Sequence, residues 1–126
     1  PRRLVIEVTE TAVLSLLPAT RDELARMTAF GVGLHVDDFG TGFSSISLLR
    51  DLPVTGVKLD GSFVRDLSSE PCSANALAAG VCGLVEGLDL TGIAECVETA
   101  EEAEILKQQG WAIGQGYLFG APAPLT

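Results

Sequence analysis

The sequence predicts an α/β fold, in which a parallel sheet is covered by helices on its outer side. Short apolar segments alternate with helix-like segments in the order β-α-β-α-β-α-β-α-β, and this order is typical of parallel sheets. A polar or charged residue also stands at or near the carboxyl end of every expected strand. Finally, 47% apolar and 20% charged residues indicate a packed globular body rather than disorder.

The chain opens with an apolar segment that predicts a strand over residues 3–8. Thr9 is expected to cap a short helix over residues 12–17, because a threonine side chain can accept a hydrogen bond from the first turn. Pro18 should end that helix, since a proline inside a helix removes a hydrogen bond and clashes with the preceding turn.

A second helix is expected over residues 21–30. Thr20 would cap it, and Glu23 three residues later would complete a capping box. Gly31 should end it, because glycine readily takes the left-handed conformation that closes many helices.

The rest of the chain continues the alternation. Further strands are expected over residues 33–37, 56–60, 91–97 and 111–114, a short helix within 43–50 and another over 62–67, and longer helices over 73–88 and 100–109. Thr99 should cap the last helix, which carries acidic residues in its first turn. The Ala-Pro-Ala-Pro tail at 121–124 cannot extend a strand.

Two adjacent acids, Asp37 and Asp38, come directly after the second expected strand, and a glycine-rich turn follows them. Like charges side by side repel each other, and a divalent cation such as Mg²⁺ is a common compensation because it prefers carboxylate oxygens. Asp, Gly and Ser also dominate ordinary turns, so a solvated acid pair is the alternative. The segment alone leaves both interpretations open.

Polar strand ends recur along the whole chain. They comprise Glu7, Asp37 with Asp38, Lys58, Glu95 with Glu98, and Gln115. Ligand sites of parallel α/β folds lie at the carboxyl edge of the sheet, whether the sheet is a barrel or open. The pattern therefore predicts a single site at that edge.

Charge and composition exclude several classes of function. A net charge of −9 argues against broad attraction to DNA, RNA or an anionic membrane. The longest apolar run, residues 76–85, is too short to span a bilayer. Cys72, Cys82 and Cys96 have no C-x-x-C spacing, which favours reduced thiols and a cytoplasmic location.

Five motifs of this chain resemble the motifs of a known protein family. They are Glu7-Val8-Thr9-Glu10, Asp37-Asp38-Phe39-Gly40-Thr41-Gly42, Lys58-Leu59-Asp60, Glu95-Cys96-Val97-Glu98-Thr99 and Gln115-Gly116-Tyr117-Leu118-Phe119. In order and spacing they resemble the EAL domain, a family of bacterial cyclic di-GMP phosphodiesterases and their inactive relatives. The resemblance covers essentially the whole chain.

The resemblance implies a modified TIM-type (β/α)₈ barrel. A full barrel needs about 250 residues, so residues 1–126 would be the carboxyl-terminal part of an EAL domain, a partial barrel of about five parallel strands with outer helices. The amino-terminal strands would be absent, together with the Glu-Ala-Leu segment and an asparagine that supply metal ligands in active members.

The resemblance also implies the roles of individual residues. Glu7, Asp37 and Asp38 would bind metal, Lys58 would orient the attacking water, and Glu95 would be the general base or a metal-proximal group. Supporting or substrate-binding positions would be Glu10, Thr41, Asp60, Glu98 and Gln115. Of these, Glu10, Glu98 and Gln115 would hold the loop after the second strand, which contains Thr41, Ser44 and Ser45.

The implied reaction is hydrolysis of cyclic di-GMP to linear pGpG, assisted by Mg²⁺ or Mn²⁺, with two ions in the complete domain. A homodimer is the expected assembly, in bacterial signalling. A degenerate domain that binds cyclic di-GMP or a protein without turnover is the alternative. The 126-residue fragment alone is expected to be inactive.

The chain departs from the family pattern at several positions. Cys96 stands where glycine is usual, so its side chain would either tilt Glu95 or be absorbed by packing. Gly61 and Ala121 stand where basic residues are common, and Phe43 where tyrosine is usual. His35 shares strand parity with Asp37, and we expect it to be a packed interior histidine rather than a ligand.

Overall fold

The computed structural model describes residues 2–41, 45–65, 67 and 71–125. Its elements are β1 (Val5–Thr9), α1 (Glu10–Leu14), α2 (Pro18–Ala29), β2 (Gly33–Phe39), α3 (Ser45–Asp51), β3 (Gly56–Leu59), α4 (Gly61–Arg65), α5 (Pro71–Gly87), β4 (Thr91–Ala94), α6 (Ala100–Gln109) and β5 (Ile113–Gly114). The predicted alternation of strands and helices is therefore confirmed.

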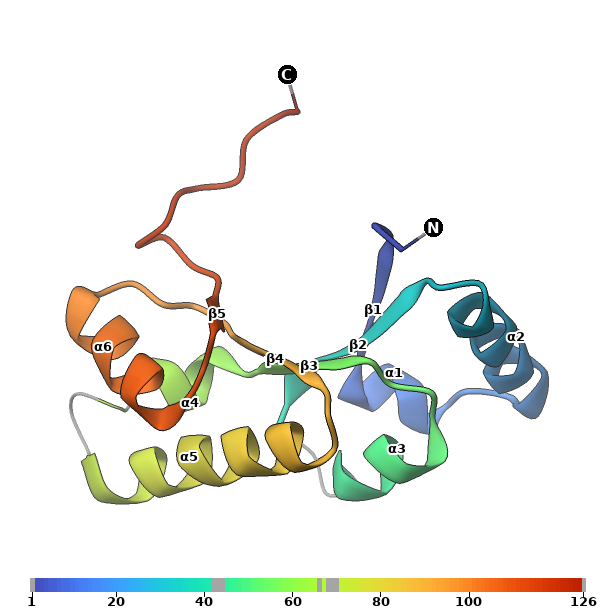
Figure 1. Cartoon of the computed structure of the whole chain (residues 1–126), viewed down its shortest axis with the longest axis horizontal. Helices are drawn as coiled ribbons and strands as arrows, with labels where there is room; N and C mark the ends of the chain where they lie inside the picture. Colours follow the sequence, from blue (N-terminus) through green and yellow to red (C-terminus); the bar gives the residue numbers. More distant parts are fainter. Residues whose placement is uncertain (1, 42–44, 66, 68–70, 126) are drawn as a thin grey trace.

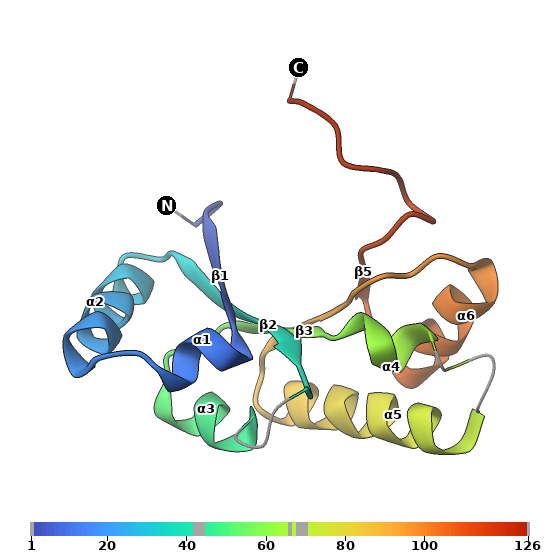
Figure 2. The same ribbon diagram turned by 180° about the vertical axis from the view of Figure 1, so that it is seen from behind.

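The five strands form one sheet in the order β1-β2-β3-β4-β5, and all neighbouring pairs are parallel. The sheet curves, the helices lie along its convex side, and β1 and β5 form its two edges (Figures 1 and 2). This open, curved sheet agrees with the prediction of a partial barrel. None of the described helices combines the length and the apolar character needed to cross a lipid bilayer.

The strand register brings the carboxyl ends of the strands to one edge. Thr9 of β1 is level with Asp37 of β2, and Leu59 of β3 is level with Ala94 of β4. The β2–β3 ladder shifts between Val36 and Phe39, where β2 carries one extra residue. A bulge of this kind bends the strand and re-aims its side chains.

The core lies between the sheet and its helices, in two clusters that share Val81. One cluster is built around Leu59, Val64, Ala78, Leu106 and Trp111, and the other around Val13, Val36, Phe39, Val57 and Val85. All four residues of β3 are buried, because this strand is central in the sheet. Its position makes β3 the rigid support for Lys58.

The predicted boundary between the first two helices is wrong. Pro18 begins α2 instead of ending α1, because the first turn of a helix has no hydrogen bond for proline to break. Thr20 lies inside α2 and does not cap it, and the actual cap residue, Leu17, forms no side-chain cap hydrogen bond. Gly31 closes the helix with φ +96°, as expected.

Several other boundaries move by a few residues. Thr9 caps α1 as predicted, although the helix begins directly at Glu10. β4 ends at Ala94 instead of residue 97, and Cys96 just beyond it takes a left-handed conformation with φ +58° that departs from the extended backbone of a regular strand. Phe43 and Ser44 lie outside the described residues.

Helix α6 has a complete set of end signals. The Thr99 side chain accepts a hydrogen bond from the Glu102 backbone N–H, and the Glu102 carboxylate accepts one from the Thr99 N–H at 2.9 Å. Glu102 is buried, and Gly110 ends the helix with φ +109°. This capping box holds the chain that leaves the site after Glu95.

We predict that Thr99→Ala lowers the free energy of unfolding of the complete domain by about 1 kcal/mol, because a backbone donor loses its cap. Urea denaturation measures the change. Thr20→Ala is the matched control and should stay within about 0.5 kcal/mol of the parent, because Thr20 does not cap a helix. A larger loss for Thr20→Ala than for Thr99→Ala would contradict these helix boundaries.

Candidate metal and active site

Side chains from four strand ends meet at the carboxyl edge of the sheet. Glu7 comes from β1, Asp37 and Asp38 from β2, Lys58 from β3, and Glu95 follows the last residue of β4. The convergence that the strand-end pattern predicted is therefore present in the structure.

Lys58 lies between the acidic residues of this edge. Its side chain is only 3% exposed, and its Nζ lies 3.0 Å from Oε1 of Glu7 and 2.8 Å from Oε1 of Glu95. Burial disfavours the ammonium, but the two carboxylates outweigh this effect, so the pKa of Lys58 is raised. Lys58 thus stays charged and joins the ends of β1, β3 and the β4 segment.

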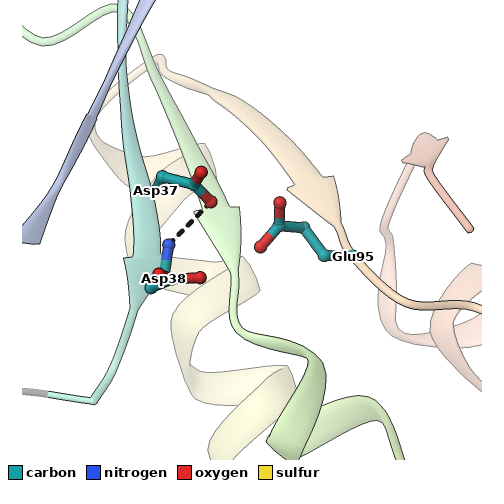
Figure 3. Close-up of side chains that lie close together, drawn as sticks. All are labelled: Asp37, Asp38 and Glu95. Carbon is teal, nitrogen blue, oxygen red and sulfur yellow. Dashed lines mark hydrogen bonds between the residues drawn. The ribbon is translucent and has the colours of Figure 1, made fainter.

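Asp37, Asp38 and Glu95 bring their carboxylate oxygens close together, as a set of possible metal ligands (Figure 3). One carboxylate oxygen from each lies within 4.8 Å of the others. The Asp38 N–H donates to Oδ1 of Asp37 at 2.9 Å, and Asp38 has φ +54°. Because Asp38 sits in the bulge of β2, neighbouring residues that would alternate in a regular strand can both serve one site.

Burial and neighbouring acids raise the pKa values of Glu95 and Asp38. Burial and the neighbouring Asp37 raise the pKa of Glu95 to about 7, although Lys58 opposes the shift. Burial, Asp37 and Asp60 raise the pKa of Asp38. Partly buried carboxyl groups that lie this close together suit a hard divalent cation, which would replace the protons that they bind.

Asp60 supports the acidic cluster from the end of β3. Its carboxyl group lies near that of Asp38 and contributes to the raised pKa of Asp38, and its Oδ2 accepts from the Ser62 N–H at 3.0 Å and from the Ser62 hydroxyl. Asp60 thereby caps α4 and touches the cluster at the same time. Ser62 was not singled out from the sequence, although a serine two residues after an aspartate at a helix start is a capping signal.

Glu10 and Thr41 act on the turn that follows Asp38. Glu10 is 1% exposed, and its Oε2 accepts from the Gly40 N–H at 3.3 Å. The Thr41 hydroxyl donates to the Asp38 carbonyl at 2.8 Å. These two contacts place both residues beside the turn, where the sequence analysis expected them.

Glu98 and Gln115 are not part of the acidic cluster. They line an adjoining cleft of about 430 Å³, together with Glu95, Cys96, Gly116 and Tyr117 among others. Tyr117 is 70% exposed and was not singled out from the sequence. Its place in the fifth motif, two residues after the predicted Gln115, was the available signal.

His35 packs inside the curve of the sheet, in agreement with the interior prediction. It is level with Glu7, and its ring covers Gly56, where a Cβ would lie 2.6 Å from the imidazole Nε2. Burial lowers the pKa of His35, although Glu7 opposes the shift. His35 is not part of the acidic donor set.

Comparison with known proteins gives one consistent result. The model of the EAL domain family matches residues 1–122. An uncharacterized signaling protein of Caulobacter vibrioides is 41% identical over 125 residues, covering 99% of this chain and 15% of that protein. The cyclic di-GMP phosphodiesterase RocR of Pseudomonas aeruginosa is 36% identical over 124 residues, covering 98% of this chain and 31% of that protein.

Solved structures agree with the sequence comparison. The PaMucR phosphodiesterase in its c-di-GMP complex superimposes with a TM-score of 0.88 at 36% identity, over 98% of this chain and 50% of that chain. Klebsiella pneumoniae BlrP1, in a manganese and cy-diGMP complex, gives 0.90 at 37% identity, over 98% of this chain and 31% of that one. The chain therefore spans half or less of the length of each of these relatives.

The raised pKa of Glu95 predicts how stability changes with pH. Between its ordinary value of 4.5 and about 7, Glu95 is protonated in the folded protein and ionised in the unfolded chain. The folded state then binds more protons, so stability falls as the pH rises through this window. We expect the melting temperature of the metal-free complete domain to fall from about pH 5 to about pH 8, and to fall less in Glu95→Gln.

Exposed Glu104 provides the control, since Glu104→Gln should follow the parent curve. Added Mn²⁺ should raise the melting temperature more at the higher pH, because protons and cations compete for the same carboxylates. Equal pH curves for the parent and Glu95→Gln would contradict the assignment.

Proposed function

Since this chain belongs to the EAL domain family, we propose that the complete domain hydrolyses cyclic di-GMP to linear pGpG with bound divalent cations. The observation that carries this proposal is the set of Asp37, Asp38 and Glu95 oxygens within 4.8 Å, next to a buried lysine. Such a set holds hard cations, and no other arrangement of the described residues offers three acidic ligands so close together.

Glu7, Asp37 and Asp38 are the proposed metal ligands, and Glu95 lies close enough to share a cation with the two aspartates. The donor set is made of oxygens, which suits Mg²⁺ or Mn²⁺, and we propose two ions in the complete domain. The relatives solved with manganese and with calcium support a divalent cation of this class. When bound, such cations lower the pKa of water and offset charge on the phosphodiester.

Lys58 is proposed to orient the attacking water. An ammonium has three N–H donors, and two of them are directed to Glu7 and Glu95. The third can donate to the water or to a phosphate oxygen. Glu95, with a pKa of about 7, is suited to accept a proton near neutral pH.

The remaining proposed positions hold this arrangement or contact the substrate. Glu10 and Thr41 hold the turn after Asp38, and the Asp60 N–H donates to the carbonyl of Phe39, the next residue after Asp38. Glu98 and Gln115 line the cleft beside Glu95, which can receive the part of the dinucleotide that extends from the reacting phosphate. Supports of this kind matter because a loosely held metal ligand loses activity.

A non-catalytic receptor or interaction module is the alternative function. The presence of Lys58 between Glu7 and Glu95 favours catalysis, because binding alone does not require a buried lysine at the acidic edge. Replacement of the upstream glutamate and asparagine ligands in the longer protein would favour the alternative. We further propose a cytoplasmic homodimer, and the free thiols of Cys82 and Cys96 suit a reducing compartment.

Incubation of the complete domain with cyclic di-GMP and Mg²⁺ or Mn²⁺ should yield pGpG on chromatography, and EDTA should abolish the product. Lys58→Ala should lower kcat by about 100-fold or more, because the water loses its positioning group. Exposed Lys107 provides the control, and Lys107→Ala should retain full activity. A domain that carries the upstream ligands yet produces no pGpG would exclude the proposed reaction.

Residues 1–126 alone should be inactive, because the family places two further metal ligands upstream and the outer sides of β1 and β5 carry no neighbouring strand in the described sheet. Open edges promote pairing with other chains, so the fragment should also self-associate. Its turnover and its mass in sedimentation test this. A monomeric fragment as active as the complete domain would contradict it.

A further inference from the structure

We infer that Cys96 and Gly61 form a matched pair of positioning residues that sets the distance between the ends of β3 and β4, and with it the place of the Glu95 carboxylate beside Asp37 and Asp38. This inference rests on the proposed function for its catalytic consequence only. The contact itself, and its effect on cation binding, do not depend on which substrate the domain hydrolyses.

The first observation is a steric one. A Cβ at position 61 would lie 2.5 Å from Sγ and 2.7 Å from Cβ of Cys96, and both distances are shorter than atoms tolerate. Although Cys96 is largely exposed, these two atoms face the backbone of Gly61, which is buried. Rotation of the thiol could relieve the first overlap, but the Cβ is fixed by the backbone.

The second observation concerns backbone conformation. Gly61 does not have a positive φ, so its backbone does not require glycine. What requires glycine there is the side chain of Cys96. Cys96 itself has φ +58°, a conformation that few residues other than Gly, Asn and Asp adopt readily. Strained backbone of this kind persists only where neighbouring atoms hold it, and it is frequent at functional sites.

The third observation is the position of the pair in the fold. The Glu95 N–H donates to the Leu59 carbonyl at 3.2 Å, just beyond the last residue pair of the β3–β4 ladder. The next residue after Glu95 is Cys96, and Gly61 begins α4. The contact between Gly61 and Cys96 therefore joins the two segments that follow β3 and β4, just beyond the last paired residues of these strands.

Both members of the pair are bonded in sequence to residues of the acidic cluster. Gly61 follows Asp60, whose N–H donates to the carbonyl of Phe39, the residue after Asp38, at 3.3 Å. Cys96 follows Glu95, which lies 2.8 Å from Lys58. A displacement at either position passes through one peptide bond to a carboxylate of the site. The contact favours the second alternative for Cys96, because its side chain packs against a residue that has no side chain.

The test uses the complete domain and four proteins: the parent, Gly61→Ala, Cys96→Gly and the double variant. Gly61→Ala should weaken Mn²⁺ binding by about 10-fold, the scale seen when groups behind metal ligands are removed, and should lower kcat while KM for cyclic di-GMP changes less than about twofold. In the double variant the added methyl has room, so Mn²⁺ binding and kcat should return to the values of Cys96→Gly. Mn²⁺ dissociation constants come from electron paramagnetic resonance titration, and melting temperatures are taken without metal.

Gly92 supplies the matched control, because a Cβ there would also crowd a neighbour, Trp111, at 2.9 Å, but at the opposite end of β4. Gly92→Ala should lower the melting temperature, leave the Mn²⁺ dissociation constant unchanged and gain nothing from Cys96→Gly. If Gly61→Ala does not fold, Cys96→Leu crowds the contact from the other side and should weaken Mn²⁺ binding, whereas Cys96→Ala should not.

Unchanged Mn²⁺ binding in Gly61→Ala, or a double variant that does not recover, would overturn the pairing. An inactive parent that still binds Mn²⁺ would overturn the proposed reaction. In that case the Mn²⁺ dissociation constants and the metal-free melting temperatures of the same four proteins would still test whether Cys96 and Gly61 act as a pair.

Discussion

The buried ammonium of Lys58 is the interaction on which the site depends. A lysine that is 3% exposed is costly to bury without partners, and here two carboxylates from different strands supply them. In return, Lys58 offsets part of the repulsion among the acids at this edge. Strand β3, which is buried along its whole length and has a neighbouring strand on each side, holds Lys58 among the described acids of this edge.

Lys58 does not neutralise the site alone. Burial and the neighbouring Asp37 still raise the pKa of Glu95 to about 7, and burial, Asp37 and Asp60 raise that of Asp38. The described edge also places four acids, Glu7, Asp37, Asp38 and Glu95, beside the ammonium of Lys58, which cannot compensate all of them when they are ionised. This remaining charge is what suits the site to divalent cations. It is also compatible with the proposed binding of an anionic dinucleotide despite the net charge of −9, since bound metal would supply the local positive charge.

Local irregularities of the backbone, rather than regular strands, aim the acidic side chains. Asp38 belongs to the Asp37–Asp38–Glu95 set, and Cys96 directly follows Glu95. Both residues have a positive φ. The bulge in β2 directs two neighbouring aspartates to one site, and the left-handed Cys96 ends β4 directly after Glu95. Such conformations are held by contacts with Glu10, Thr41 and Gly61, which are therefore part of the site although they do not belong to the acidic set.

The sequence by itself determined the alternation of strands and helices and the meeting of Glu7, Asp37, Lys58 and Glu95 at one edge. Both follow from local patterns, because apolar periodicity defines an element and parallel strands align their carboxyl ends. Local patterns failed at Pro18, where the same residue can end one helix or begin the next. Only the tertiary structure decided which carboxylates share a ligand set, how far their pKa values shift, and that Cys96 fits against Gly61. Those properties depend on distances between residues far apart in the chain, and no local pattern encodes such distances.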